Sequence, residues 1–337
     1  MSPRVTSYRD ASKRRVPGQR PDEPDWLRWE APLQPPVPTM AGPWNDDISA
    51  LPVDRQRTRR LVDVDVPLKC EGGGRPWEGS SYGATITPFT RSTPSHLVWD
   101  DSRGFVDNLV SPLRVQLPEW VRREGDPVGS SDRHVWLHDV ERRRLVELIQ
   151  FDDISPRWGT TLRVGYAGGG RGAVTWDLSK PWDPRTAPRG VVAANVPQLI
   201  HAFGWERIRG GGGCLFGTLP NVRRGFVGWA RGGDGDLGLD DTPVCTGDLL
   251  RLTCEAYIEL CALHPVGTPA RAIVDRLFTH GFVVGDTTSD GGAPDVGAAS
   301  LLLTMDRRWV TGEGDTPPLA DLKLRLSMFE LVLITNT

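Results

Sequence analysis

Apolar and polar residues alternate with a period of two in many short runs of this chain, and turn residues separate the runs. This period puts apolar side chains on one face of a strand. We therefore expect strands at LVDVDVPL (61–68), ATITPFT (84–90), LRVQL (113–117), HVWLHDV (134–140), LVELIQF (145–151), TLRVGY (161–166), AVTWDL (173–178), GFVVGD (281–286) and LSMFELVLI (326–334). The ERRR break after the fourth run predicts a hairpin, and TLRVGY and AVTWDL flank a glycine-rich turn. Many short strands at this spacing indicate a sandwich or barrel.

One segment has the periodicity of a helix instead. Thr268 is a capping residue, Pro269 suits the first turn, and Gly281 is a helix-ending residue. Between them, Ile273 and Leu277 are spaced by one helical turn. The pattern predicts a single short amphipathic helix in an otherwise all-β chain.

The first 60 residues lack both periodicities. They hold ten of the 29 prolines, and proline removes the N–H donors that helices and sheets use. We expect residues 1–60 to form an extended arm that becomes ordered on a partner chain, with Trp26, Trp29 and Trp44 as anchors. Residues 61–337 would then form the β-sandwich domain.

Composition narrows the classes of function. The chain has 337 residues, of which 38% are apolar, and a net charge of -3. That length supports a large core, and that charge argues against binding to nucleic acid. The N-terminus carries charges where a signal peptide needs an apolar stretch, and no run is long enough to span a membrane, so we expect synthesis and retention in the cytoplasm. Five cysteines without a C-x-x-C pair predict free thiols.

The run SDRHVWLHD has the composition of an active-site or metal-binding loop. On a strand, His134, Trp136 and His138 share one face, so the two histidines could bind a metal if a third ligand joined them. No such ligand is indicated. The interpretation we favour makes Asp132 and Arg133 part of a turn and lets His134 donate to a backbone carbonyl inside the sheet.

Other candidate catalytic and phosphate-binding motifs lack the flanking residues or elements that their chemistry requires. GSSYG (79–83) lacks the strand before it and the helix after it that a hydrolase nucleophile requires. The glycine run 210–213 is not followed by the G-K-[ST] of a phosphate loop. Carboxylate pairs at 100–101 and 152–153 would serve glycoside hydrolysis only if two carboxylates met across a groove. We expect no catalytic residue, no cofactor and no enzyme activity.

An acidic glycine-rich stretch is a weak candidate for a metal site. Asp234, Asp236 and Asp240 have a spacing that could hold calcium, but the glycine and glutamate of an EF-hand loop are missing. An exposed acidic turn is the preferred interpretation. Trp229 precedes this stretch, and we expect it to be a stacking platform for sugar at the edge of the loop.

The order of several motifs resembles a jelly-roll domain of minor tail and related virion proteins of phages that infect actinobacteria, which also occurs in secreted bacterial proteins. The matching motifs are D-R-H (132–134), L-V-E-L (145–148), W-D-L (176–178), GVVAANVPQLIHAF (190–203), GWA (228–230), GDLLRL (247–252), the predicted helix and GFVVGD. The resemblance covers about residues 130–335. After His-Ala this chain reads Phe203-Gly204-Trp205 where the family usually has Leu-Arg-Phe, and after the helix it reads GDTT where the family tends to have A-D-N-G.

This resemblance implies a structural function. The family carries no agreed catalytic residues, and its signature positions here, Asp132, Arg133, His134, Trp176, Asp177 and His201, look structural, with His201 on a strand and Trp176 and Asp177 at a strand end. The implied fold is a jelly-roll β-sandwich with one helix and an N-terminal arm. We expect a minor tail protein of an actinophage virion, at the tail tip or fibre, that assembles in the host cytoplasm.

The expected partners are other virion proteins, bound through the arm, further copies of this chain in a homo-oligomer, and host cell-wall glycan. Nucleic acid and membrane insertion are not expected. Two alternatives stay open: a capsid-decorating protein, and a carbohydrate-binding or polysaccharide-cleaving jelly-roll protein.

Overall fold

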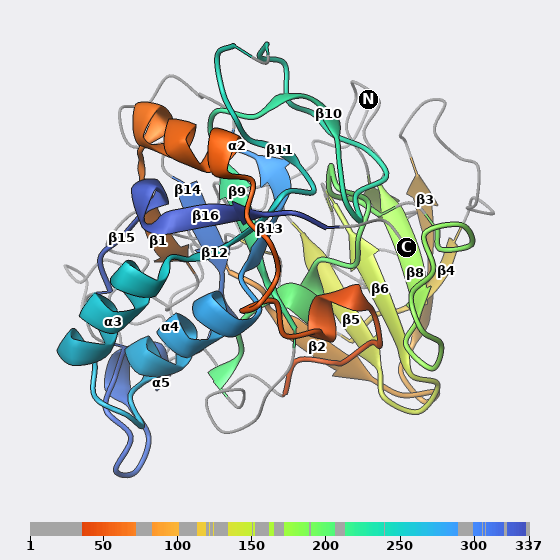
Figure 1. Ribbon diagram of the computed structural model, residues 1–337. Coiled ribbons are helices and arrows are strands. Elements are labelled where there is room, and N and C mark those ends of the chain that lie inside the picture. Colours follow the sequence, from red (N-terminus) through yellow and green to blue (C-terminus); the bar gives the residue numbers. More distant parts are fainter. Residues whose placement is uncertain are drawn as a thin grey trace, which may run out of the picture.

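The chain folds mainly into β-sheets, with a few short helices at the periphery (Figure 1). The structure is a computed structural model. It describes residues 36–71, 83–100, 113–118, 121, 124, 134–149, 151, 162–164, 172–188, 190–205, 213–238, 240–288, 299–304, 306, 308–319 and 322–334. The predicted β-rich class is confirmed.

A seven-stranded sheet is the largest element, with strand order β15-β1-β14-β9-β13-β12-β16. Its strands, in chain order, are β1 (Pro67–Glu71), β9 (Leu215–Leu219), β12 (Leu249–Leu252), β13 (Phe282–Thr287), β14 (Ala299–Leu302), β15 (Leu324–Arg325) and β16 (Phe329–Val332). The sheet is mixed, because β1 runs parallel to β14 and β13 runs parallel to β9, while the other neighbours are antiparallel.

Two smaller sheets stack on one another. The four-stranded sheet has the order β2-β5-β6-β8, and the three-stranded sheet has the order β4-β3-β7. Their strands are β2 (Ile86–Phe89), β3 (Ser95–Asp100), β4 (Leu113–Gln116), β5 (Val135–Asp139), β6 (Arg144–Leu148), β7 (Leu162–Val164) and β8 (Ala173–Asp177). The pairs β2–β5 and β3–β7 are parallel. A separate parallel pair joins β10 (Arg223–Phe226) to β11 (Cys245–Thr246).

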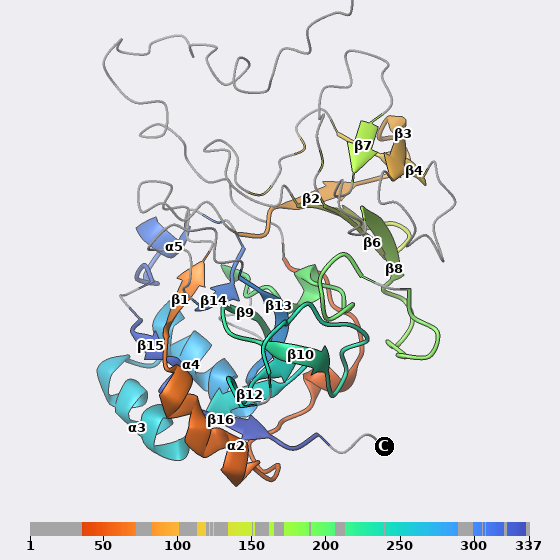
Figure 2. The ribbon, with the colours of Figure 1, turned by 90° about the horizontal axis from the view of Figure 1, so that it is seen from above.

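The sheets form layers with three apolar clusters, and Figure 2 shows the layers side by side. The outer core fills the space between the three-stranded and four-stranded sheets, with Val115, Val135, Leu137 and Phe151 among its residues. The central core lies between the four-stranded and seven-stranded sheets and includes Trp44, Trp136, Trp176, Trp182, Trp229 and Phe216. The helix-side core covers the other face of the seven-stranded sheet and includes Leu215, Leu250, Ile273, Leu277 and Phe282.

Alternation along each strand assigns its side chains to these cores. On β5, Val135 and Leu137 enter the outer core while Trp136 enters the central core. On β9, Leu215 and Phe216 point to opposite faces of the seven-stranded sheet in the same way. A strand that is buried on both faces needs apolar residues at nearly every position, which is why these runs are so apolar.

Most of the predicted strands are present. The runs at 84–90, 113–117, 134–140, 145–151, 161–166, 173–178, 281–286 and 326–334 each contain a strand, and β5 and β6 form the predicted antiparallel hairpin. By contrast, β7 and β8 belong to different sheets and do not pair with each other. The prediction for 61–68 is wrong over its first half, where a 3-10 helix, η3 (Arg60–Val64), precedes β1.

The helical segments are α2 (Arg55–Arg59), α3 (Cys254–Leu263), α4 (Pro269–Thr279) and α5 (Arg308–Thr311), with further 3-10 turns at η2 (Pro43–Asn45), η6 (Leu199–His201) and η8 (Leu326–Met328). The predicted helix is α4. Its first turn is capped by the Thr268 hydroxyl, which accepts the Arg271 N–H at 3.2 Å, and Gly281 follows with a φ of 65°. This left-handed conformation favours glycine.

The expected single helix is one of two neighbours of similar length. Helix α3 begins at the Thr253 cap, whose hydroxyl accepts the Ala256 N–H at 3.2 Å. The sequence pattern does not predict this helix, because apolar residues occupy most of its circumference and only Glu255 and Glu259 contrast with them. No helix in the described ranges has the length and apolarity needed to cross a bilayer.

The N-terminal region differs from the expected arm. Residues 1–35 lie outside the described part, but residues 36–60 pack into the body of this chain. Ile48 N–H donates to Thr279 O at 2.7 Å, Asp54 N–H donates to Leu331 O at 2.9 Å, and Val53 forms a bridge with Val332. Trp44 is 2% exposed. The tryptophan and the aliphatic residues of 37–48 supply enough apolar area to override the proline-rich composition.

Candidate functional site

A buried carboxylate, Glu147, is the chemically most unusual group in the described structure. It lies on β6 of the four-stranded sheet, bonds to Trp176 of the central core, and is fully buried. The Trp176 indole N–H donates to one carboxylate oxygen at 2.8 Å, and the Leu199 N–H donates to the other at 2.9 Å. Burial raises the pKa of Glu147 to about 7, although the hydrogen bonds from Leu199, Trp176 and Gln198 act to lower it.

His134, just before β5, is buried as well and bonds to Gln198, the residue that precedes Leu199. Its Nδ1 lies 2.8 Å from Oε1 of Gln198, and its ring centroid lies 5.2 Å from that of Trp136. Because an amide oxygen only accepts, Nδ1 carries the proton in this arrangement. The Nδ1 atom of His134 thus bonds to a side chain, that of Gln198.

Gln198 and Leu199 join Glu147 and His134 to a second histidine. Gln198 caps η6, which runs from Leu199 to His201, so His201 is on a 3-10 turn and the expectation of a strand is wrong. Its Nδ1 lies 3.1 Å from Cys214 O and 3.5 Å from Cys214 Sγ. A thiol beside an imidazole can serve as a nucleophile only where a substrate reaches it, and here Cys214 is completely buried.

Tryptophan rings of the central core pack around His201. The ring centroid of Trp44 lies 4.9 Å from His201, 5.2 Å from Trp182 and 6.3 Å from Trp229. Trp229, expected at the surface as a sugar platform, is 9% exposed and belongs to this cluster. Trp44, expected to anchor a partner chain, packs against its own chain instead. Both rings bury more apolar area inside this core than a loop position would allow.

The remaining signature residues have separate places. Trp176 and Asp177 end β8, with Trp176 buried beside Glu147 and Asp177 turned to solvent. The Asp177 carboxylate accepts the Ser179 N–H at 3.1 Å and pairs with Lys180 at 3.1 Å. These contacts, above all the hydrogen bonds from Ser179, lower the pKa of Asp177 to about 2. Asp132 and Arg133, like Trp26 and Trp29, fall outside the described residues.

The weak calcium candidates do not gather into a site. Asp234 accepts the Thr287 N–H at 3.3 Å, Asp236 is exposed, and Asp240 uses its backbone carbonyl to accept from Arg60 at 2.8 Å. Within the ranges that the structure covers, no three His, Cys, Asp or Glu side chains are grouped to bind a metal. The acidic turn instead forms hydrogen bonds to Thr287 and Arg60, which hold residues 234–240 against the rest of the chain.

The other candidate motifs fall wholly or mainly outside the described ranges. Residues 79–82 of GSSYG, 210–212 of the glycine run, 101 and 152–153 are not described, and the side chain of Asp100 is not described either. The fold therefore brings together His134, Trp176 and His201 of the predicted residues, and it adds Glu147, Gln198 and Cys214.

A surface groove of about 390 Å³ lies between residues 39–45 and the loop that follows β8. Its two cationic side chains are already engaged, because Arg143 donates to Leu178 O at 3.2 Å and Lys180 pairs with Asp177. The groove thus offers no converging set of reactive groups.

Sequence reasoning missed Glu147 as a special residue. The signal was a carboxylate at the centre of the apolar run LVELI, where a strand buried on both faces has no exposed position for a charge. Its partners could not be read from the sequence, because Trp176 and Leu199 are 29 and 52 residues away.

Comparisons with known proteins give no relative to this arrangement. The chain matches no protein-family model, no curated protein and no solved structure.

Proposed function

We propose that this chain is a structural protein of a tailed-phage virion, of the minor tail protein type, located at the tail tip or fibre. The proposal is supported by the order of motifs that resembles the jelly-roll domain of such proteins. It concerns residues 61–337 as the sandwich body and makes the chain a building block rather than an enzyme.

The observation that carries the proposal is the use of the signature residues in packing. His134, Trp176 and His201 are each at most 3% exposed, and they bond to Glu147, Gln198 and Cys214 at the junction of two sheets. Polar side chains in this position stabilise one arrangement of the layers, since any other arrangement leaves buried donors and acceptors without partners. That is the requirement of a building block.

The jelly-roll assignment is the finer part of the proposal. A jelly roll packs two sheets face to face, and the four-stranded and three-stranded sheets do so around the outer core. The parallel pairs β2–β5 and β3–β7 depart from the antiparallel jelly-roll pattern. The proposal therefore rests on the face-to-face stacking and the motif order, not on strand direction.

The proposed partners are other virion proteins and further copies of this chain. The arm that would contact them is shorter than expected, because residues 36–60 are part of the body, and it comprises residues 1–35. A glycan contact loses its best candidate, since Trp229 is in the central core.

Electron microscopy with immunogold labelling tests the proposal. Particles of the phage that encodes the chain are purified on a density gradient and labelled with an antibody against the folded protein. Gold at the tail tip or fibre is the expected result. Gold over the head would make the chain a capsid-decorating protein, and unlabelled particles with all of the chain in the soluble lysate would overturn a virion role.

A further inference from the structure

The surface groove beside residues 39–45 has the size of a small-molecule site. Its volume of about 390 Å³ lies within the range of roughly 300–1,000 Å³ that is usual for such sites. The buried part of its lining is apolar and includes Met40 and Leu178. The exposed polar part consists of Thr39, Asn45, Arg143, Ser179 and Lys180. This combination suits a ligand that has both an apolar face and hydrogen-bonding groups.

Hydrogen bonds between and within the two walls fix the shape of the groove. The Trp182 N–H donates to Ala41 O at 2.7 Å, which joins the loop after β8 to the segment before η2. The Trp44 indole N–H and the Asn45 side-chain amide both donate to Met40 O at 3.1 Å. A groove with fixed walls loses little conformational freedom when a ligand binds, which favours affinity.

Arg143 is held at the groove by its backbone as well as by its side chain. Its φ is 51°, in the left-handed region that favours glycine. The Leu178 N–H donates to Arg143 O at 2.8 Å, and the Arg143 guanidinium donates back to Leu178 O at 3.2 Å. The turn between β5 and β6 would accept glycine with less strain, so the shape of the turn does not call for a guanidinium at this position.

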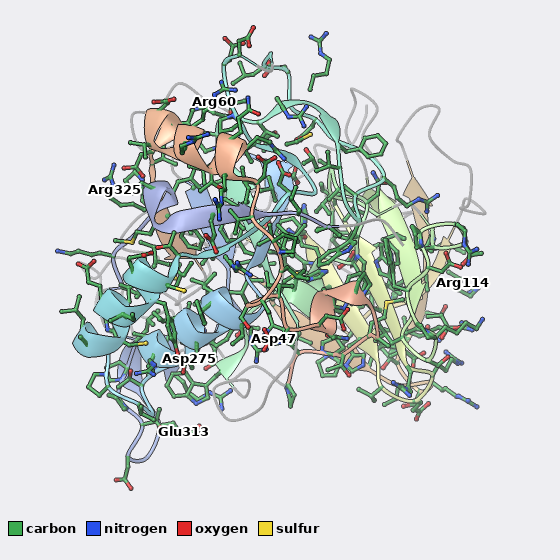
Figure 3. All side chains as sticks on the ribbon, in the orientation of Figure 1. Asp47, Arg60, Arg114, Asp275, Glu313 and Arg325 are labelled. Atoms are coloured by element: carbon green, nitrogen blue, oxygen red, sulfur yellow. The ribbon has the colours of Figure 1, made fainter. Side chains whose placement is uncertain are left out.

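The groove carries an excess of positive charge. A guanidinium has five N–H donors, and the bond to the loop after β8 uses one nitrogen of Arg143. No carboxylate in the described ranges forms an ion pair with Arg143, whereas Lys180 is balanced by Asp177 at 3.1 Å. Asp47, which Figure 3 labels just after η2, accepts the Ser49 N–H at 2.8 Å and does not line the groove. The complementary ligand group should therefore carry one negative charge.

We propose that this groove binds a carboxylate-bearing sugar, a hexuronate unit of an acidic glycan. The guanidinium of Arg143 pairs with the carboxylate, the C–H face of the sugar ring covers Met40 and Leu178, and the ring hydroxyls bond to the polar rim. The site binds the sugar and carries out no chemistry on it. The inference deepens the proposed function, and rests on it for the source of the glycan, by giving the chain a contact with the host surface in place of Trp229.

A sugar carboxylate fits this lining better than a phosphate does. A planar guanidinium pairs with one carboxylate through two parallel hydrogen bonds. A phosphate monoester carries about -1.5 to -2 charges at pH 7, and Arg143 alone would leave part of that charge unbalanced. The small apolar area next to hydroxyl and amide groups matches a sugar ring, which has an apolar face and polar edges.

Isothermal titration calorimetry of the full-length chain tests the site. The probe is trigalacturonic acid in a buffer of low ionic strength, and galactotriose, which has no carboxylates, is the matched neutral ligand. Arg143→Gly removes the guanidinium and leaves a residue that adopts the positive φ without strain. Arg144→Gln is the control, because Arg144 is exposed on β6, carries the same charge and does not line the groove.

The wild type and Arg144→Gln should bind trigalacturonic acid with a Kd of about 1 mM or tighter. Arg143→Gly should bind at least about tenfold more weakly while its melting temperature stays close to that of the wild type. Thr39→Glu, which adds a carboxylate to the opposite wall without changing the turn, should weaken binding as well. Galactotriose should bind at least about tenfold more weakly to the wild type than trigalacturonic acid does.

Four results would overturn the proposal: no binding by the wild type, equal binding by Arg143→Gly and Thr39→Glu, equal affinity for galactotriose, or an equal loss of binding in Arg144→Gln. Failure here is separable from failure of the proposed function, because the titration uses the purified chain. A chain that is labelled in particles but does not bind trigalacturonic acid has a virion role without this site. A chain that binds the sugar but is missing from particles keeps the site and loses the virion role.

Discussion

Glu147 accepts a hydrogen bond from the Trp176 indole N–H at 2.8 Å, and neither side chain is exposed to solvent. The pair joins β6 to β8 across the four-stranded sheet, and the second carboxylate oxygen reaches Leu199. A single acidic group thus connects a strand, its neighbour and the segment that carries His201. Loss of any of these bonds leaves a polar atom without a partner inside the core.

Stability should depend on pH through Glu147. The folded pKa of about 7 is above the ordinary value of 4.5, so the folded state binds the proton more tightly than the unfolded state. The contribution of Glu147 to the free energy of unfolding should be largest below about pH 4.5, fall between pH 4.5 and 7 by up to ~3 kcal/mol, and stay constant above pH 7. Urea denaturation of the wild type across this range measures the decrease.

Glu147→Gln should remove that component of the pH dependence. Between pH 4.5 and 7 the free energy of unfolding should decline less in this variant than in the wild type by roughly 3 kcal/mol. Glu141→Gln, which changes an exposed carboxylate in the β5–β6 turn, is the matched control and should follow the wild type. Parallel curves for the wild type and Glu147→Gln would show that Glu147 does not titrate in this range.

Removing Arg57 should destabilise the whole protein. Its guanidinium pairs with Asp248 and also donates to Pro243 O at 2.8 Å, which fastens α2 to the loop before β12. Arg57→Met leaves the Asp248 carboxylate buried without its cation, at a cost of about 2–4 kcal/mol after allowance for the 22% exposure of the Arg57 side chain. Arg59→Met on the exposed side of α2 should cost little. Equal urea midpoints for the two variants would show that residues 36–60 are not part of the cooperative fold.

His134→Ala should lower stability through lost packing and a lost hydrogen bond. The change leaves the Gln198 amide oxygen without its donor and opens a cavity beside Trp136, which together cost on the order of 1–3 kcal/mol. His138→Ala, on β5 and only half-buried, is the control. Thermal denaturation should separate the two. An unchanged melting temperature for His134→Ala would mean that His134 does not support the fold.

The glycine-rich loop 232–238 should tolerate side chains unequally. A Cβ at Gly235 would lie 2.4 Å from Arg223 O and 2.6 Å from Val222 O, both rigid backbone atoms, whereas at Gly238 its nearest neighbour is the movable Asp241 carboxylate at 3.0 Å. Gly235→Ala should cost about 1–3 kcal/mol, and Gly238→Ala should cost much less. Equal melting temperatures would indicate that the loop stands away from β10.

The sequence predicts strands well where short apolar runs are bounded by turn residues, as at β5 and β6, even though both faces of these strands are buried. It fails at 61–64 because Asp54 accepts the Arg57 N–H at 3.0 Å and starts a helical segment, α2 and then η3, that runs into the alternating residues. Helix α3 is missed because only Glu255 and Glu259 interrupt its apolar residues, which leaves little contrast between its faces. Local patterns could not reveal Trp44 in the core, because its contacts with Trp182, His201 and Trp229 join distant parts of the chain.

Contacts between distant parts of the chain also limit what the sequence shows of the candidate site. The sequence shows the spacing of the histidines in HVWLHD, and strand geometry correctly predicts that the side chains of Val135 and Trp136 point to opposite faces of the sheet. Gln198 and Cys214, however, reach the histidines only through folding over 64 and 13 residues. Spacing alone could not distinguish buried histidines from an open metal site.

The copy number of the chain in purified particles tests the virion role most directly. Quantitative mass spectrometry of gradient-purified particles, before and after a high-salt wash, measures it against a known capsid protein. A fixed ratio that survives the wash is the result expected of a structural component. A ratio that falls toward zero on washing, or a chain found only in the soluble lysate, would contradict the account.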